Sequence, residues 1–119
     1  MENEKKGVIQ ISDEVISVIA ATAAKEVEGV EKLTAPSNLM GKFGKKNTNR
    51  SKGVELEIAD GNVKVNVSIT ALYTSKIREV AQQVQDNVKN AIETMTGLNV
   101  TLVNVIVADI YRPSEEPTE

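Results

Sequence analysis

The chain lacks the two residues on which most enzyme and metal sites depend. None of its 119 residues is cysteine or histidine. Without cysteine there are no disulfides, thiolate nucleophiles or zinc–thiolate sites. Without histidine the commonest general base and metal ligand is missing. The carboxylates remain as candidates, but turns, a helix start and solvent-facing strand positions explain most of them. Asp109, among apolar neighbours, reads as the end of a strand. We therefore expect no enzymatic activity, no metal and no cofactor.

Aromatic residues and long apolar runs are also scarce. Only Phe43, Tyr73 and Tyr111 are aromatic, so stacking platforms for single-stranded nucleic acid are thin. The net charge of −3 makes the chain as a whole a poor ligand for polyanions. No apolar run approaches the length of about 20 residues that spans a bilayer. The charged residues 1–6 are not followed by the apolar core of a signal peptide. We therefore expect a cytoplasmic protein without direct membrane insertion.

The most informative feature that is present is an amphipathic stretch at 73–107. Its helical part has one apolar stripe about a third of the circumference wide, as on a helix that packs on a core. A membrane-surface helix would carry more cations and bulkier apolar residues. Gly97 lies where a left-handed cap would end the helix. The stripe consists of Ile77, Val80, Ala81, Val84, Val88, Ala91, Ile92 and Met95.

The remaining elements follow from alternation, caps and turns. Ser12 is a good N-cap for a first helix, whose inward face would begin at Val15, and Thr74 or Ser75 would cap the second. Asp60-Gly61 predicts a tight hairpin turn. In the last strand the apolar phase flips between Leu102 and Val103, so it is either bulged or buried on both sides. The sequence predicts strands at 7–11, 30–34, 53–59, 62–71 and from 98 onward, with helices at 12–28 and 74–96.

These elements predict an α+β fold with the order β-α-β-β-β-α-β. It is a two-layer sandwich with two helices on one face of a mostly antiparallel mixed sheet, and alternation in the hairpin predicts a wet opposite face. A single domain would span 7–111 and include a long basic loop at 35–52. We expect residues 1–6 to be flexible and the acidic tail 112–119 to be disordered.

Two groups of residues are candidates for partner binding. The first is the basic loop, which carries no acid and could meet phosphates or an anionic membrane surface; the alternative is a solvated connector. The second is the amide-rich polar face of the long helix. The candidates are Lys42, Lys45, Lys46, Arg50 and Lys52 in the loop, and Gln82, Gln85, Lys89 and Glu93 on the helix.

Three segments of the chain resemble a known family. They are GVIQISDEVISVIAATAAKEVEGVEKL, GVELEIADGNVKVNVSI and IREVAQQVQDNVKNAIETMTGLNVTLVNVIVADI. With these motifs, the chain resembles the alkaline shock protein family, also called the Gls-type envelope stress response family, of mostly Gram-positive bacteria. The resemblance implies a cytoplasmic protein of cell-envelope homeostasis, without established catalytic residues. Some members of the family lie at the membrane through an integral membrane partner.

Two functions remain open at this point. The leading one is a non-enzymatic interaction module that binds protein partners, among them an integral membrane protein, or binds itself. The alternative is a nucleic-acid-binding or lipid-synthesis-linked regulator that uses the basic residues of 42–52. The weak overall charge and the few aromatic residues argue against nucleic acid.

Overall fold

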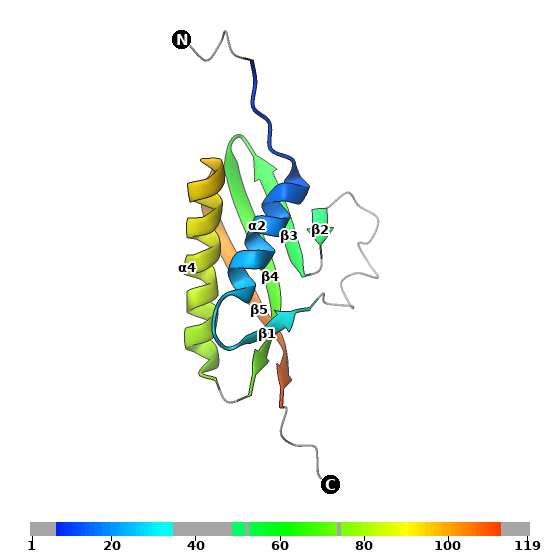
Figure 1. Cartoon of the computed structure of the whole chain (residues 1–119), viewed down its shortest axis with the longest axis vertical. Coiled ribbons are helices and arrows are strands. Elements are labelled where there is room, and N and C mark those ends of the chain that lie inside the picture. The colour runs from blue at the N-terminus through cyan, green and yellow to red at the C-terminus, as the bar shows by residue number, and fades with distance from the viewer. Residues whose placement is uncertain (1–6, 35–48, 52, 74, 113–119) are drawn as a thin grey trace.

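The computed structural model describes residues 7–34, 49–51, 53–73 and 75–112, which form two helices packed on one sheet (Figure 1). This arrangement confirms the predicted two-layer α+β class, with its mostly antiparallel mixed sheet. The elements, in chain order, are α2 (Asp13–Lys25), β1 (Val30–Leu33), β2 (Asn49–Ser51), β3 (Val54–Ala59), β4 (Asn62–Leu72), α4 (Ile77–Thr96) and β5 (Asn99–Tyr111).

Strand β4 is the centre of the sheet. On one side it pairs antiparallel with β3 over its first half and with β1 near its end. On the other side it pairs with β5 in parallel along its whole length. The short strand β2 extends the sheet beyond β3. The long helix α4 supplies the crossover that a parallel β4–β5 connection requires.

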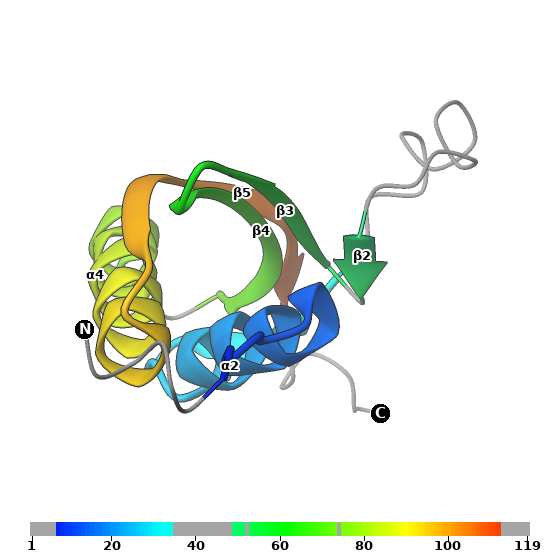
Figure 2. The same cartoon turned by 90° about the horizontal axis from the view of Figure 1, so that it is seen from above.

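The core lies between the two helices and the sheet, whose strands curve around it (Figure 2). The long helix buries Val80, Val84, Val88 and Ile92, the centre of the predicted stripe. From the sheet, alternate residues of β4 point inward and are fully covered, among them Val65. The helices are also tied to each other, since the Asn87 side-chain amide donates a hydrogen bond to the Ala23 carbonyl at 2.8 Å.

Three local signals act as the sequence predicts. The Ser12 hydroxyl accepts a hydrogen bond from the Val15 N–H at 3.2 Å and so caps α2. Gly97 ends α4 with a φ of 80°. Asp60 and Gly61 both adopt positive φ, 53° and 80°, as a tight hairpin between right-twisted strands requires.

Several predictions about the elements are wrong. Residues 7–11 form no strand; they precede α2 as an irregular segment because nothing in the described chain pairs with them. The predicted loop at 35–52 contains a strand, β2, at its end. The first helix stops at Lys25 rather than at 28. The second begins at Ile77 without a side-chain cap, because the Ser75 hydroxyl donates to the Leu72 carbonyl instead.

The predicted burial also needs correction at four positions. Val15 and Met95 were expected in the core but are 48% and 66% exposed, since they lie at the borders of their stripes. Ser68 and Thr70 were expected on a wet face of β4 but are buried. At Thr70 the outer face of β4 is covered, since the Thr70 hydroxyl shares a hydrogen bond with the Thr34 hydroxyl. The predictions for 1–6, for most of the basic loop and for the acidic tail lie outside the described residues.

Candidate interaction surface

Strand β5 is an edge of the sheet along its whole length. In the described part of the chain it pairs only with β4, from Asn99 beside Asn62 to Tyr111 beside Leu72. Its other side therefore presents backbone N–H and C=O groups to no strand. Natural edge strands are usually short, or carry lysine or proline that prevents pairing. This one has 13 residues, no proline and a single charged residue, Asp109, so its sequence does little to block a further strand.

Two irregularities decide which β5 side chains face the core. The register against β4 shifts at Thr101 and again at Ala108, neither of which has a partner residue in β4. The first shift confirms the predicted bulge and places it at Thr101. As a result Val103, Val105 and Val107 face the helices, while Leu102 turns to the outer face; after the second shift it is Ile110 that lies beside the buried Ala71.

The outer face of β5 and its end carry exposed apolar and aromatic side chains. Leu102, Ile106 and Tyr111 are 46%, 42% and 45% exposed. Tyr73 joins them, because its N–H donates to the Tyr111 carbonyl at 2.9 Å. The Arg112 guanidinium lies 4.5 Å from the centre of the Tyr73 ring. Tyrosine and arginine are enriched in protein interfaces. We call these five residues the β5 surface: Leu102, Ile106, Tyr111, Tyr73 and Arg112.

The long helix covers the beginning of the β5 edge. The Val100 N–H donates to a Glu93 carboxylate oxygen at 2.9 Å, and the Gln85 side-chain amide donates to the Val103 carbonyl at 3.1 Å. These contacts satisfy edge groups that would otherwise need a strand or water. A shallow cavity of about 210 Å³ lies between the two elements here. The open part of the edge is therefore its second half, residues 104–111.

Electrostatics strengthens this contact between helix and edge. The Lys89 ammonium lies 3.0 Å from the same Glu93 oxygen, one helical turn away. The Val100 N–H, and after it the Lys89 side chain, lowers the pKa of the Glu93 carboxyl. Glu93 therefore holds the strand as a carboxylate and is committed to a structural contact.

The structure gives the predicted helix candidates two different roles. Gln85, Lys89 and Glu93 come together, as their spacing predicts, but Gln85 and Glu93 bind β5 of their own chain and Lys89 pairs with Glu93. Gln82 is exposed on the same helix. In the basic group, the backbone of Arg50 lies in β2 opposite Glu55. Lys42, Lys45, Lys46 and Lys52 lie outside the described residues.

Sequence reasoning missed the β5 surface. The sequence left open whether this strand is bulged or buried on both sides, because alternation shows which residues share a face and not whether that face is covered. The position of β5 at an edge follows from pairing with β4, which no local pattern reports. A usable signal was the phase flip at the bulge, which moves Leu102 out of the core set.

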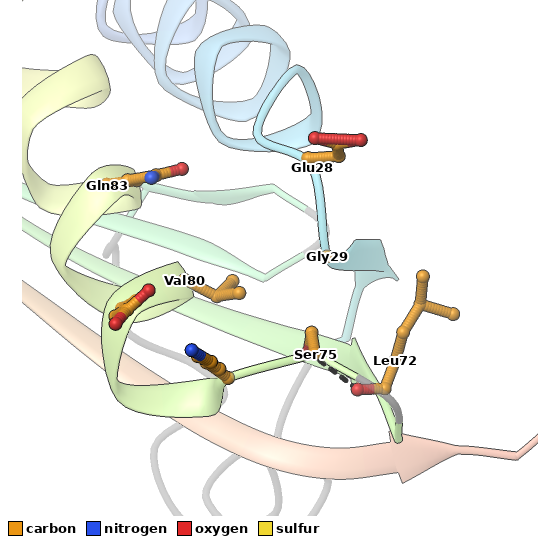
Figure 3. Close-up of a pocket in the computed structure, with 8 residues that line it drawn as sticks. Glu28, Gly29, Leu72, Ser75, Val80 and Gln83 are labelled. Carbon is orange, nitrogen blue, oxygen red and sulfur yellow. Dashed lines mark hydrogen bonds between the residues drawn. The ribbon is translucent and has the colours of Figure 1, made fainter.

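A second hollow lies where α2 ends and α4 begins, with a volume of about 350 Å³ (Figure 3). Its floor is a close approach at Gly29, whose φ is 101°. A Cβ placed there would lie 2.5 Å from Cγ2 of Val80. The Ser75 hydroxyl, at the rim, donates to the Leu72 carbonyl at 2.6 Å. We therefore interpret this hollow as a place where the helices pack on the sheet, rather than as a binding site.

Two further findings apply to the described residues alone. No group of three or more aspartate or glutamate side chains among them is arranged to hold a metal ion. None of their helices is long and apolar enough to cross a membrane.

The fold and the β5 surface together define a two-layer α+β domain with a long open sheet edge that carries the exposed apolar side chains of Leu102 and Ile106. The chain belongs to the alkaline shock protein 23 family, which has a cell envelope-related function and whose model matches residues 1–112. This confirms the resemblance found in the sequence, and the function of the chain is accordingly related to the cell envelope.

Relatives from Bacillus subtilis and Streptococcus pyogenes support the same family. The chain is 32% identical to the protein YqhY of Bacillus subtilis over 111 residues, covering 92% of this chain and 81% of that one. It is 34% identical to the protein Spy1614 of Streptococcus pyogenes over 110 residues, 91% of each. A stress response regulator gls24 homolog of Streptococcus pyogenes is 29% identical over 107 residues, which are 88% of this chain and 59% of that one.

Among solved structures, a copper form of the MamM CTD shares the fold. It superposes with a TM-score of 0.51 over 87% of this chain and 100% of that one, at 11% sequence identity. An identity this low supports a common fold alone.

Proposed function

We propose that this chain is a non-enzymatic protein-interaction module of the envelope stress response, which binds partners through the β5 surface and the open edge beside it. The observation that carries the proposal is the long edge strand whose outer face keeps Leu102 and Ile106 nearly half exposed. Addition of a strand to such an edge is a recurring mode of recognition. Main-chain hydrogen bonds supply affinity in this mode, and side chains on the two faces supply specificity.

Magnitudes indicate how a partner must bind. Fully burying a leucine or isoleucine contributes about 1.5–3 kcal/mol, so the exposed halves of Leu102 and Ile106 offer about 1 kcal/mol each. Each new backbone hydrogen bond adds about 0.5–1.5 kcal/mol. Association itself costs about 4–15 kcal/mol. Neither the edge nor the outer face suffices alone, so a partner has to engage both.

The partners we propose are proteins, with an integral membrane protein first among them. In this proposal the chain is cytoplasmic and is held at the membrane by that partner rather than by inserting itself. The family's cell envelope-related function supports this. The alternative, a nucleic-acid or lipid-synthesis-linked regulator, depends on basic residues of which most lie outside the described ones, while the exposed face of β5 includes the apolar Leu102 and Ile106 and no basic residue.

A comparative pull-down tests the proposal. Tagged wild-type chain is recovered from its native cells with membranes retained, next to Ile106→Lys and a control, Thr22→Lys, which adds the same charge to an exposed position of α2. We expect Ile106→Lys to lose the partners while it keeps the wild-type melting temperature, and Thr22→Lys to keep both. Equal capture by all three chains would refute the proposal.

A third arm separates the alternative. Replacing Lys42, Lys45, Lys46, Arg50 and Lys52 by glutamine leaves the β5 surface unchanged. We expect this variant to capture the same proteins as wild type at low and high salt. If capture depends on these residues and falls as salt rises, the basic loop binds the partner instead.

A further inference from the structure

The segment just before α2 is apolar and pairs with no strand of the described chain. Gly7 to Ile11 reads Gly-Val-Ile-Gln-Ile, a composition that favours strands. Yet Val8 is 82% exposed and Ile9 is 89% exposed. Single exposed apolar residues are common, but two adjacent ones in a strand-forming segment indicate a surface that is covered in another state.

The open half of the β5 edge offers matching backbone groups. The Val103 carbonyl points to the free side of β5, where Gln85 reaches it. In a strand the backbone groups of alternate residues point to the same side. Val105 and Val107 therefore direct their N–H and C=O groups to that side too, beyond the last contact with the helix. Between 104 and 108 the edge carries no charged residue.

The two features lie too far apart to meet within one chain. Segment 7–11 leaves the molecule at the end where α2 begins, and β5 runs from that end to the opposite one, where its open half lies (Figure 1). A five-residue strand spans only about 17 Å. The segment would have to bridge this separation while still attached to Ser12, which caps α2.

We infer that residues 7–11 of one copy add as a strand to the open β5 edge of a second copy. This rests on the proposed function, since it names another copy of the chain as a partner of that surface. One orientation suits both faces: Ile9 lies on the outer face beside Ile106, and Gln10 lies on the helix side toward the exposed Gln82, while Ile11 keeps its packing against the core of its own copy. No charge is buried in this arrangement, because the paired segments contain none.

Reciprocal exchange of the segments gives a dimer, and one-way donation gives a larger assembly. In both, Ile9 of one copy lies next to Ile106 of another. A competing site exists within the same copy: β2 pairs with only part of β3, so Glu57 to Ala59 also have a free side close to the start of α2. Glu57 makes this edge more polar.

Cysteine cross-linking tests the pairing, because the wild-type chain has no cysteine. Differently tagged full-length Ile9→Cys and Ile106→Cys chains are mixed and oxidised. We expect a disulfide-linked product that carries both tags. The control pairs Ile9→Cys with Thr22→Cys, which lies on exposed α2, and should give at most a small fraction of that product. Equal yields in the two mixtures would overturn the inference, as would an intramolecular disulfide in an Ile9→Cys/Glu57→Cys double variant.

The mass in solution is the second readout. Light scattering should give wild type a mass above that of one chain at micromolar concentrations, and Ile9→Lys the mass of one chain with an unchanged melting temperature. A monomeric wild type would overturn the inference. The mass and the pull-down together separate the two proposals. If wild type is monomeric but capture of partners still requires Ile106, the self-association is refuted and the interaction module stands.

Discussion

Val84→Asp is the sharpest test of the fold as described. Val84 lies at the centre of α4 and is 0% exposed, within the cluster that joins both helices to the sheet. Burying a valine contributes about 1.5–3 kcal/mol. An unpaired buried carboxylate adds a cost of several kcal/mol. Against a total stability of about 5–15 kcal/mol, we expect a mostly unfolded protein.

Two further variants calibrate the result. Val84→Ala removes two methyl groups and leaves a small cavity, which costs about 2 kcal/mol and should lower the melting temperature by about 8 °C. Gln82→Asp places the same carboxylate on an exposed position of the same helix, where surface changes stay within about 0.5 kcal/mol. The measurement is thermal unfolding followed by circular dichroism. If Val84→Asp melted like Gln82→Asp, α4 would not pack on the sheet through this face.

Three other outcomes follow from particular contacts. Gly29→Ala should lower the melting temperature more than Gly97→Ala. Both positions need positive φ, which costs a residue with a Cβ about 1–2 kcal/mol, but only at Gly29 would the Cβ also meet a neighbour, Cγ2 of Val80 at 2.5 Å. Equal shifts in melting temperature would mean that the Val80 side chain moves aside at no cost. Ser17→Ala should raise stability by up to about 1 kcal/mol in chemical denaturation, because the Ser17 hydroxyl is buried without a hydrogen-bond partner; a loss of stability would indicate a partner. Glu93→Gln should destabilise at neutral pH and match wild type in acid: the lowered pKa of Glu93 means that its contribution is present above the ordinary glutamate pKa and is lost as the pH falls through the lowered value. A constant difference in melting temperature between Glu93→Gln and wild type across this range would contradict the role of the carboxylate.

Local chemistry explains what could be predicted from the sequence. The spacing of Val80, Val84, Val88 and Ile92 fixes a buried helix face, and Gly97 ends that helix in the left-handed conformation, which glycine adopts more readily than other residues. The Asp60-Gly61 pair sets the hairpin, and the phase flip before Val103 left two possibilities, of which the structure has the bulge. Each of these signals depends on residues a few positions apart, so a single sequence contains it in full.

What could not be predicted depends on neighbours that are distant in the chain. Residues 7–11 have strand composition but no adjacent strand in the described chain, so propensity alone does not order them. The spacing of Gln85, Lys89 and Glu93 places them on one helix face. It does not reveal that this face meets the edge of β5, which makes Gln85 and Glu93 structural rather than free for a partner. The edge position of β5 itself emerges only from the whole sheet.

Site-specific photo-cross-linking in living cells tests the central claim most directly. A photoreactive residue replaces Ile106 in one strain and Thr22 in another, both exposed in the structure. The account predicts protein adducts, identified by mass spectrometry, at position 106 and far fewer at position 22, because β5 binds partners and that side of α2 does not. Equal labelling at the two positions, or adducts at 22 alone, would contradict the assignment of the β5 surface as the site of interaction.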